Sequence, residues 1–174
     1  MVLSPEVYAR RRRAFVERIG PRAAAVFPAA PVAARSDDVE HRYRQDSDLL
    51  YLTGFQGPEA GCLLLPGHPK EEFILFVQPR DPERETWTGR RAGVEGALEI
   101  FGAQVAYTID KLDEKIGEYV SERDQLYYAF GRDAAFNDRV VRWMRQWRLT
   151  RPRSGTGPAA VLDPGEVLHE LRLR

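Results

Sequence analysis

The sequence has few of the residues that form disulfides and metal sites. It contains one cysteine, Cys62, and three histidines. A single cysteine cannot form a disulfide within the chain, so nothing indicates an oxidising compartment; the apolar run 61–65 around it favours a buried strand position. His41, His68 and His169 lack metal-ligand spacing such as His-x-x-x-His. We therefore expect no metal to be bound by this chain.

An excess of charge and a long apolar run are also missing. Twenty-six basic residues balance 26 acidic ones, so no net charge attracts nucleic acid or an anionic membrane. Two arginine clusters, Arg10–Arg13 and Arg139–Arg153, indicate solvated helix faces, because neither is interleaved with a stacking platform for bases. The first residues lack the apolar segment of a signal peptide, and no run is long enough to span a bilayer. These absences predict a cytoplasmic location, with no nucleic-acid or membrane partner.

The common catalytic motifs are absent as well. The sequence contains no Gly-x-Gly-x-x-Gly, no Gly-x-x-x-x-Gly-Lys-Ser/Thr and no Gly-x-Ser-x-Gly, so neither a phosphate cradle nor a nucleophile elbow is indicated. The acids of Asp37-Asp38 and Asp46-Ser47-Asp48 could bind a cation. Neighbouring loop acids of this kind are more often solvated, capping, or paired with nearby arginines.

Strand patterns and helix patterns alternate along the chain. The apolar runs Ala60–Leu65 and Phe73–Val77 flank a Pro-Gly-His-Pro turn and predict a β-hairpin. Further strands are predicted at Ala23–Phe27, Gln104–Tyr107 and Gln125–Phe130. Helices are predicted from Pro5 to Gly20, over Ala92–Phe101, Asp110–Val120 and Ala134–Leu149, and from Pro164 onward. The alternation predicts an α/β fold, a single domain with a mixed β-sheet flanked by helices on both faces.

Two segments carry a more specific pattern. The first is Tyr43-Arg44-Gln45-Asp46-Ser47-Asp48 with Tyr51-Leu52-Thr53-Gly54-Phe55, and the second is Glu85-Thr86-Trp87-Thr88-Gly89-Arg90-Arg91. They resemble the patterns Tyr-Arg-Gln-x-Ser-Asp, Tyr-x-Thr-Gly-Phe and Glu-x-Trp-x-Gly-Arg-Arg of the amino-terminal domain of aminopeptidase P (Xaa-Pro aminopeptidase). The opening arginines 11–13 and the closing segment 167–173 match too, so the resemblance spans nearly the whole chain.

The resemblance implies a fold similar to the creatinase and prolidase amino-terminal domains. Residues 1–160 would form that domain, and residues 161–174 would begin a linker helix into a missing carboxy-terminal metallopeptidase domain. In the family, the latter "pita-bread" domain holds two metal ions, usually manganese, and removes the residue that precedes proline at a peptide's amino terminus. The parent is therefore expected to be a manganese-dependent aminopeptidase. The chain alone is expected to be inactive, with no catalytic residue and no metal ligand.

The resemblance also implies partners and site residues. The expected partners are the protein's own catalytic domain, further copies in a dimer or tetramer, and peptides with proline at the second position. Trp87, predicted to lie in a loop, would reach across a subunit interface and wall the substrate pocket of a neighbouring catalytic domain. Asp38 corresponds to an acid that forms ion pairs near the active-site entrance. Arg44, Arg90 and Arg91 would pair with carboxylates at a domain or subunit contact, with ordinary surface salt bridges as the alternative.

Two local expectations concern helix ends. Ser47 is expected to cap a short helix that ends at Gly54. An apolar face around Val167, Leu168 and Leu171 is expected to be exposed in the isolated chain.

Two other functions stay open: a prolidase or creatinase-like hydrolase, and a stand-alone non-enzymatic dimerisation or binding module.

Overall fold

A six-stranded mixed sheet forms the centre of the computed structural model, which describes residues 3–33 and 42–174. The strand order is β4-β3-β2-β1-β5-β6. The strands are β1 (Ala23–Pro28), β2 (Gly61–Leu64), β3 (Phe73–Val77), β4 (Val105–Thr108), β5 (Gln125–Tyr127) and β6 (Ala160–Leu162). β2 runs antiparallel to β1 and β3, and the remaining neighbours are parallel. The predicted α/β fold with a mixed sheet is confirmed.

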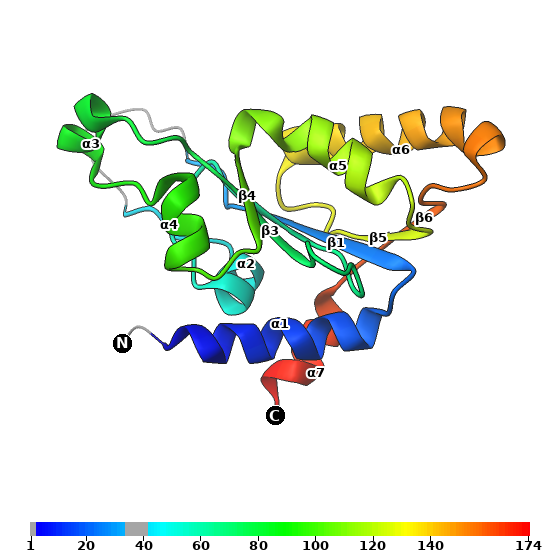
Figure 1. Cartoon of the computed structure of the whole chain (residues 1–174), viewed down its shortest axis with the longest axis horizontal. Helices are drawn as coiled ribbons and strands as arrows, with labels where there is room; N and C mark the ends of the chain where they lie inside the picture. Colours follow the sequence, from blue (N-terminus) through cyan, green and yellow to red (C-terminus); the bar gives the residue numbers. More distant parts are fainter. Residues whose placement is uncertain (1–2, 34–41) are drawn as a thin grey trace.

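Helices cover both faces of this sheet, as Figure 1 shows. One face is covered by α1 (Pro5–Ile19), α2 (Ser47–Thr53), α4 (Gly93–Glu99) and α7 (Gly165–Arg172). The other is covered by α5 (Leu112–Val120), which follows the 3-10 turn η1 (Ile109–Lys111), and by α6 (Ala134–Ser154). The remaining helix, α3 (Pro82–Thr88), lies at one end of the molecule and contributes no buried residue.

Each central strand supplies side chains to two separate cores, because successive strand residues point to opposite faces. In β2, Cys62 and Leu64 join the core beneath α1, whereas Leu63 joins the core beneath α5 and α6. Phe15 of α1 is fully buried in the first core, and Trp143 of α6 is 7% exposed in the second. The continuous apolar runs seen in the sequence follow from burial on both faces.

The last helix belongs to the same packed unit. α7 packs beside α1, with Leu168 fully buried and Val167 and Leu171 partly buried against the first core. The expectation of an exposed apolar face there is wrong, because the apolar side of α7 faces the domain itself. β6, which the sequence did not predict, pairs with β5 from Ala160 onward. The expected boundary after residue 160 therefore falls within a strand, while the linker role of α7 stays a prediction.

α6 is longer than the sequence indicated. Its predicted end was Leu149, but the helix continues to Ser154 and ends at Gly155, whose φ of 73° places it in the left-handed region. Pro152 lies within the final turn. Proline has no backbone N–H, so it removes one hydrogen bond of the helix. In the last turn this loss does not stop the helix from forming, and the helix ends soon afterwards.

The Arg10–Arg13 cluster does not lie wholly in solvent. Arg12 is buried, and its Nη1 donates to the carbonyl oxygen of Leu52 at 2.9 Å. Arg11 Nη1 donates to the carbonyl oxygen of Tyr51 at 3.1 Å. These carbonyls lie at the C-terminal end of α2, where helix carbonyls lack internal donors and carry partial negative charge. The prediction of a solvated face is wrong for Arg12, whose pKa is lowered by burial.

Candidate functional site: an arginine-lined cleft beside α3

The first part of the site is α3. The Asp81 side chain accepts from the backbone N–H of Arg84 at 3.2 Å, Pro82 occupies the first turn, and Gly89 with φ 92° follows the last residue. Trp87, predicted to lie in a loop, is therefore helical and is 89% exposed. The start and stop signals were present in the sequence. A helical spacing of apolar residues was not present, because no residue of α3 is buried.

The turn after α3 is held by Glu85. Its carboxylate accepts the backbone N–H of Arg91 at 2.6 Å and the Nε of Arg80 at 2.7 Å, and its side chain is 7% exposed. The N–H of Arg91 is the main cause of a lowered pKa at Glu85, with Arg80 contributing. A Cβ on Gly93 would lie 2.7 Å from Cγ of Arg80, so the backbone approaches that side chain closely. These contacts position the Gly89–Gly93 segment.

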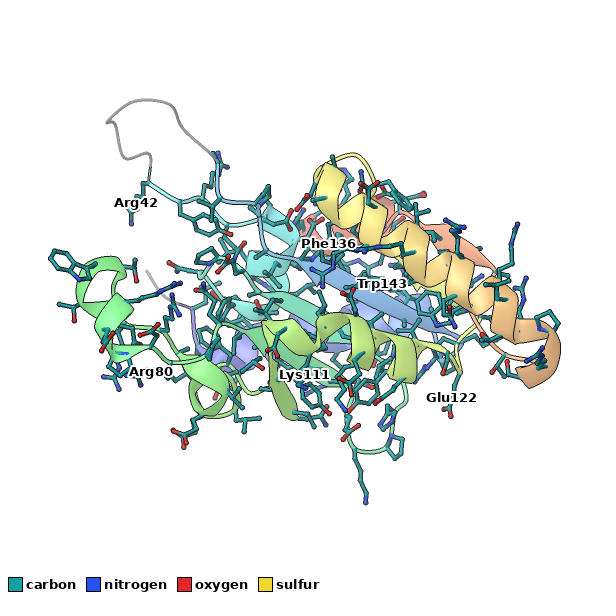
Figure 2. The ribbon with its side chains drawn as sticks, turned by 90° about the horizontal axis from the view of Figure 1, so that it is seen from above. Arg42, Arg80, Lys111, Glu122, Phe136 and Trp143 are labelled. Carbon is teal, nitrogen blue, oxygen red and sulfur yellow. The ribbon has the colours of Figure 1, made fainter. Side chains whose placement is uncertain are left out.

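A cleft of about 760 Å³ lies beside this segment. Its apolar lining comes from Val32, Phe55, Val77 and Phe101. Among residues 3–33 and 42–174, its charged lining consists of four arginines, Arg42, Arg84, Arg90 and Arg91, and one carboxylate, Glu59. Figure 2 shows Arg42 and Arg80 at the end of the molecule that carries α3. Guanidinium groups bind carboxylates through paired hydrogen bonds, so the cleft suits a ligand or partner with carboxylates.

Tyr43 lines the cleft and belongs to the Tyr43–Asp48 motif, which holds the neighbouring loops together. Buried Gln45 accepts from the backbone N–H of Ala30 at 3.0 Å, and its Nε2 donates to the carbonyl oxygen of Gly57 at 2.8 Å. The Tyr43 hydroxyl lies 2.7 Å from the Ala30 carbonyl oxygen, and burial raises the pKa of Tyr43 to about 12. Tyr43 and Gln45 thus join the segment after β1 to the loop before β2.

The acids of this motif serve structure rather than cation binding. Asp46, not Ser47, caps α2: its Oδ1 accepts two backbone N–H groups of the first turn. The cap lies one residue earlier than predicted. Asp48, with a side chain 4% exposed, accepts from Arg132 Nη1 at 2.7 Å and from Arg172 Nη2 at 2.8 Å. Asp48 therefore ties α2 to α7 and to the loop before α6.

The structure brings together part of the predicted site. Arg90 and Arg91 both line the cleft. Trp87 lies on α3 and Arg44 is exposed in the Tyr43–Asp48 motif, but neither is a lining residue. Asp38 lies outside the described residues. Whether these side chains contact another domain or subunit stays a prediction.

Two lining arginines were not predicted. Arg84 precedes Thr88 by four residues, so the two share one side of α3 and both line the cleft. That relation is visible in the sequence once α3 is recognised as a helix. Arg42 is brought to the cleft by chain packing alone, and no local pattern indicates it.

The metal centre that the resemblance implies belongs to a separate catalytic domain, and the described residues of this chain form no such centre. Within residues 3–33 and 42–174, no three His, Cys, Asp or Glu side chains lie close enough to hold a metal ion. Cys62 is fully buried, and burial raises the pKa of its thiol to about 12, so it stays protonated.

None of the helices in the described part of the chain is long and apolar enough to cross a membrane.

Comparison with known proteins places the chain in a family. The family model for the aminopeptidase P N-terminal domain matches residues 8–128. The chain belongs to the aminopeptidase P family. The Xaa-Pro aminopeptidase of Escherichia coli (strain K12) is 35% identical over 173 residues, covering 98% of this chain and 39% of that protein. The Haemophilus influenzae enzyme of the same name is 35% identical over 172 residues, covering 98% of this chain and 37% of that protein.

Solved structures agree with this aminopeptidase P assignment. The structure of Pseudomonas aeruginosa aminopeptidase PepP matches with a TM-score of 0.88 and 42% identity, covering 97% of this chain and 38% of that one. The chain thus spans roughly two fifths of the length of these relatives. The match to the family model includes α3 and every residue that lines the cleft. Both the arginine cleft and exposed Trp87 therefore lie within the part of the chain that matches the aminopeptidase P amino-terminal domain.

Proposed function

We propose that this chain is the non-catalytic amino-terminal domain of a manganese-dependent Xaa-Pro aminopeptidase, which removes the amino-terminal residue that precedes proline. The domain would support oligomerisation and wall the substrate pocket of a neighbouring catalytic domain. Family membership and the names of the relatives support the activity. Because the described residues include no group suited to a metal, the ions would be held by other parts of the parent enzyme.

Trp87 is the observation that carries this proposal. Its indole is 89% exposed on a helix that buries none of its own residues. Exposing a large aromatic side chain forgoes about 25 cal/mol for each Å² of apolar surface that could be buried. Tryptophan and arginine are the residues most enriched at the energetic centres of interfaces. An indole beside Arg84, Arg90 and Arg91 therefore suits insertion into a second protein surface.

The geometry of the site supports a positioning role. Glu85 holds the backbone of the turn that carries Arg90 and Arg91, and the Arg91 guanidinium donates to the carbonyl oxygen of Pro79 at 3.1 Å, so the Arg91 side chain is placed before any partner arrives. Preorganised groups lose less conformational entropy on binding. The cleft would hold carboxylates of the partner subunit or of the peptide, while Trp87 covers part of the pocket. Chemistry at the scissile bond would be left to the catalytic domain.

Substitution of Trp87 in the parent enzyme tests the proposal. We expect Trp87→Ala to lower kcat/KM for peptides longer than the dipeptide by about tenfold or more, since one interface anchor contributes at least ~2 kcal/mol. Manganese content, measured by elemental analysis, should not change. Trp87→Phe is the matched control and should retain most of the activity. Unaltered kinetics at every peptide length would contradict the pocket role.

Substrate length also separates the proposal from the prolidase reading. The parent enzyme should hydrolyse an Xaa-Pro dipeptide and an Xaa-Pro-Xaa tripeptide, with removal of the first residue in both. Cleavage of the dipeptide alone would assign the parent to the prolidases. If the parent enzyme still hydrolysed both peptides after full removal of bound metal, it would not be a metallopeptidase.

A further inference from the structure

We propose that the outer face of α6 is a docking surface for an acidic polypeptide segment that carries apolar anchors. This face consists of Val141, Arg142, Arg145, Arg148 and Leu149, all exposed. It lies on the opposite side of the sheet from α1 and α7. The inference does not depend on the proposed peptidase function.

The charge of α6 is the first observation. The helix contains six arginines, at positions 139, 142, 145, 148, 151 and 153, and one acidic residue, Asp138. Only Arg139 lies within salt-bridge distance of a carboxylate, that of Asp113 at 3.2 Å, among residues 3–33 and 42–174. Like charges spaced three or four residues apart on a helix repel each other. A chain with no net charge therefore concentrates uncompensated positive charge on one helix.

Apolar surface is interleaved with these arginines. Val141 is 48% exposed and Leu149 is 73% exposed. A hollow of about 200 Å³ is lined by Phe130, Val141 and Met144, with Arg145, Arg148 and Arg151 at its charged side. Phe130 is itself 46% exposed. Apolar anchors in a hollow with arginines around them match the anatomy of a protein-binding surface.

A second hollow lies on the other side of α6. It measures about 280 Å³ and is lined by Asp113 and Gly117 of α5 and by Arg142, Trp143 and Trp147 of α6. Figure 2 looks onto this helical layer and shows Trp143 on α6. α6 is therefore a ridge between two hollows, with Arg142 lining one and Arg145, Arg148 and Arg151 lining the other. A segment lying across the ridge could place apolar side chains in the hollows and carboxylates on the arginines.

The choice of arginine and the neighbouring charges favour an acidic polypeptide. Guanidinium groups pair with carboxylates through two hydrogen bonds and are more weakly hydrated than ammonium groups, which suits an interface. Single-stranded nucleic acid would need a series of exposed aromatic faces for stacking, but Trp143 and Trp147 are only 7% and 3% exposed, and Phe130 alone is half-exposed among the described aromatic residues that line the two hollows. A second copy of the chain offers poor complementarity through α5, because Glu114 and Glu118 of that helix already pair with Lys111 of η1 and Lys115 of α5.

Peptide binding tests this inference directly. The probe is a labelled helical peptide of about 18 residues in which glutamates and leucines alternate by helical turn. Its affinity for the 174-residue chain is measured by fluorescence anisotropy. We expect Arg145→Glu/Arg148→Glu to weaken binding by at least about tenfold, since two charge pairs reverse sign. The matched control is Arg10→Glu/Arg13→Glu, a double reversal at exposed positions of α1, which should change affinity by less than about twofold.

Further arms of the experiment decide the partner's chemistry. A probe with glutamine in place of every glutamate should bind at least about tenfold more weakly, because it keeps the anchors and lacks the charge. Val141→Ser/Leu149→Ser should weaken binding while keeping every arginine, and circular dichroism verifies that both double variants are folded. Equal weakening by the α1 control would overturn the proposal. So would tighter binding of a single-stranded RNA of equal charge, or light scattering that shows α6-dependent self-association instead of peptide binding.

Discussion

At the scale of single residues, the family motif around Tyr43–Asp48 acts through hydrogen bonding. Gln45 joins two loops, Asp46 caps a helix, and Asp48 receives two guanidinium groups. These are polar groups with their partners in place, and no buried side-chain nitrogen or oxygen among the described residues lacks one. A motif of polar residues in a loop can therefore specify a fold as strictly as an apolar core does.

Asp48 gives the prediction at this scale. Asp48→Ala leaves Arg132 and Arg172 without their shared carboxylate, and both arginines keep part of their solvent contact, at 51% and 36% exposure. We expect a loss of about 1–3 kcal/mol in the free energy of unfolding, measured with urea. Asp124→Ala removes an exposed partner of Arg22 and should cost less than about 1 kcal/mol. Equal effects of the two changes would show that the Asp48 network contributes nothing specific.

At the scale of elements, two short helices with similar sequence signals have opposite roles. α3 begins at Pro82 directly after Asp81, and α7 begins directly after Asp163 and Pro164. α3 buries none of its residues, while α7 buries Leu168 and is joined to α1 through the Arg18–Glu170 ion pair. Local cap signals start a helix, but they do not say whether it will find a surface to pack against.

Two leucines at the end of the chain test the role of α7. Leu168 is fully buried, whereas Leu173, which follows the helix, is 74% exposed. Leu168→Ala should lower the free energy of unfolding by about 2–5 kcal/mol, since it leaves a cavity in the first core. Leu173→Ala should change it by no more than about 0.5 kcal/mol. Chemical denaturation of both variants measures the difference, and a small effect at Leu168 would mean that α7 is held only by its polar contacts.

At the scale of the whole molecule, the two cores are coupled through one sheet. Cys62 lies in the core beneath α1, and Trp143 and Trp147 lie in the core beneath α5 and α6. Each central strand contributes side chains to both cores. Loss of the helices on one face therefore removes support from strands on which the other core also depends. The packing predicts a single cooperative unfolding transition.

Two probes on opposite faces test that cooperativity. Reaction of the Cys62 thiol with a disulfide reagent at pH 8 should follow the same urea dependence as the fluorescence of Trp143 and Trp147. Trp87→Phe removes the emission of the exposed indole. Cys62 is the one cysteine in the chain, so labelling reports on the first core alone. Separate midpoints would show that the two layers unfold independently.

The Cys62 thiol also predicts how stability depends on pH. Its pKa is raised to about 12 in the folded chain because burial disfavours the thiolate. In the unfolded chain the thiol ionises near its ordinary value of about 8.5. The contribution of this group to folding is therefore complete below about pH 8.5 and is lost as the pH rises toward 12. The free energy of unfolding, measured with urea, should differ less between pH 8 and pH 10 for Cys62→Ala than for the wild type.

Much of the fold followed from local patterns. The strand runs Ala23–Phe27, Ala60–Leu65 and Phe73–Val77 were predicted correctly, because strands buried on both faces leave continuous apolar runs. Weak elements were missed or misplaced. β6 spans only the three residues Ala160–Leu162, none of which is fully buried, while α3 was predicted as a loop because no face of it is buried. Periodicity reports burial, so an element that buries little leaves little trace in the sequence.

For the site, the chain's residue types and motifs were enough to indicate the aminopeptidase P family, and to predict Trp87, Arg90 and Arg91 as candidates. The cleft itself depends on distant segments, since Arg42 and Phe101 are brought together only when the sheet and α4 have packed. The same holds for Asp48, whose partner Arg172 is 124 residues away. Motifs are read within a short window of sequence, whereas burial, charge pairing and cleft shape arise from contacts between segments far apart in the chain.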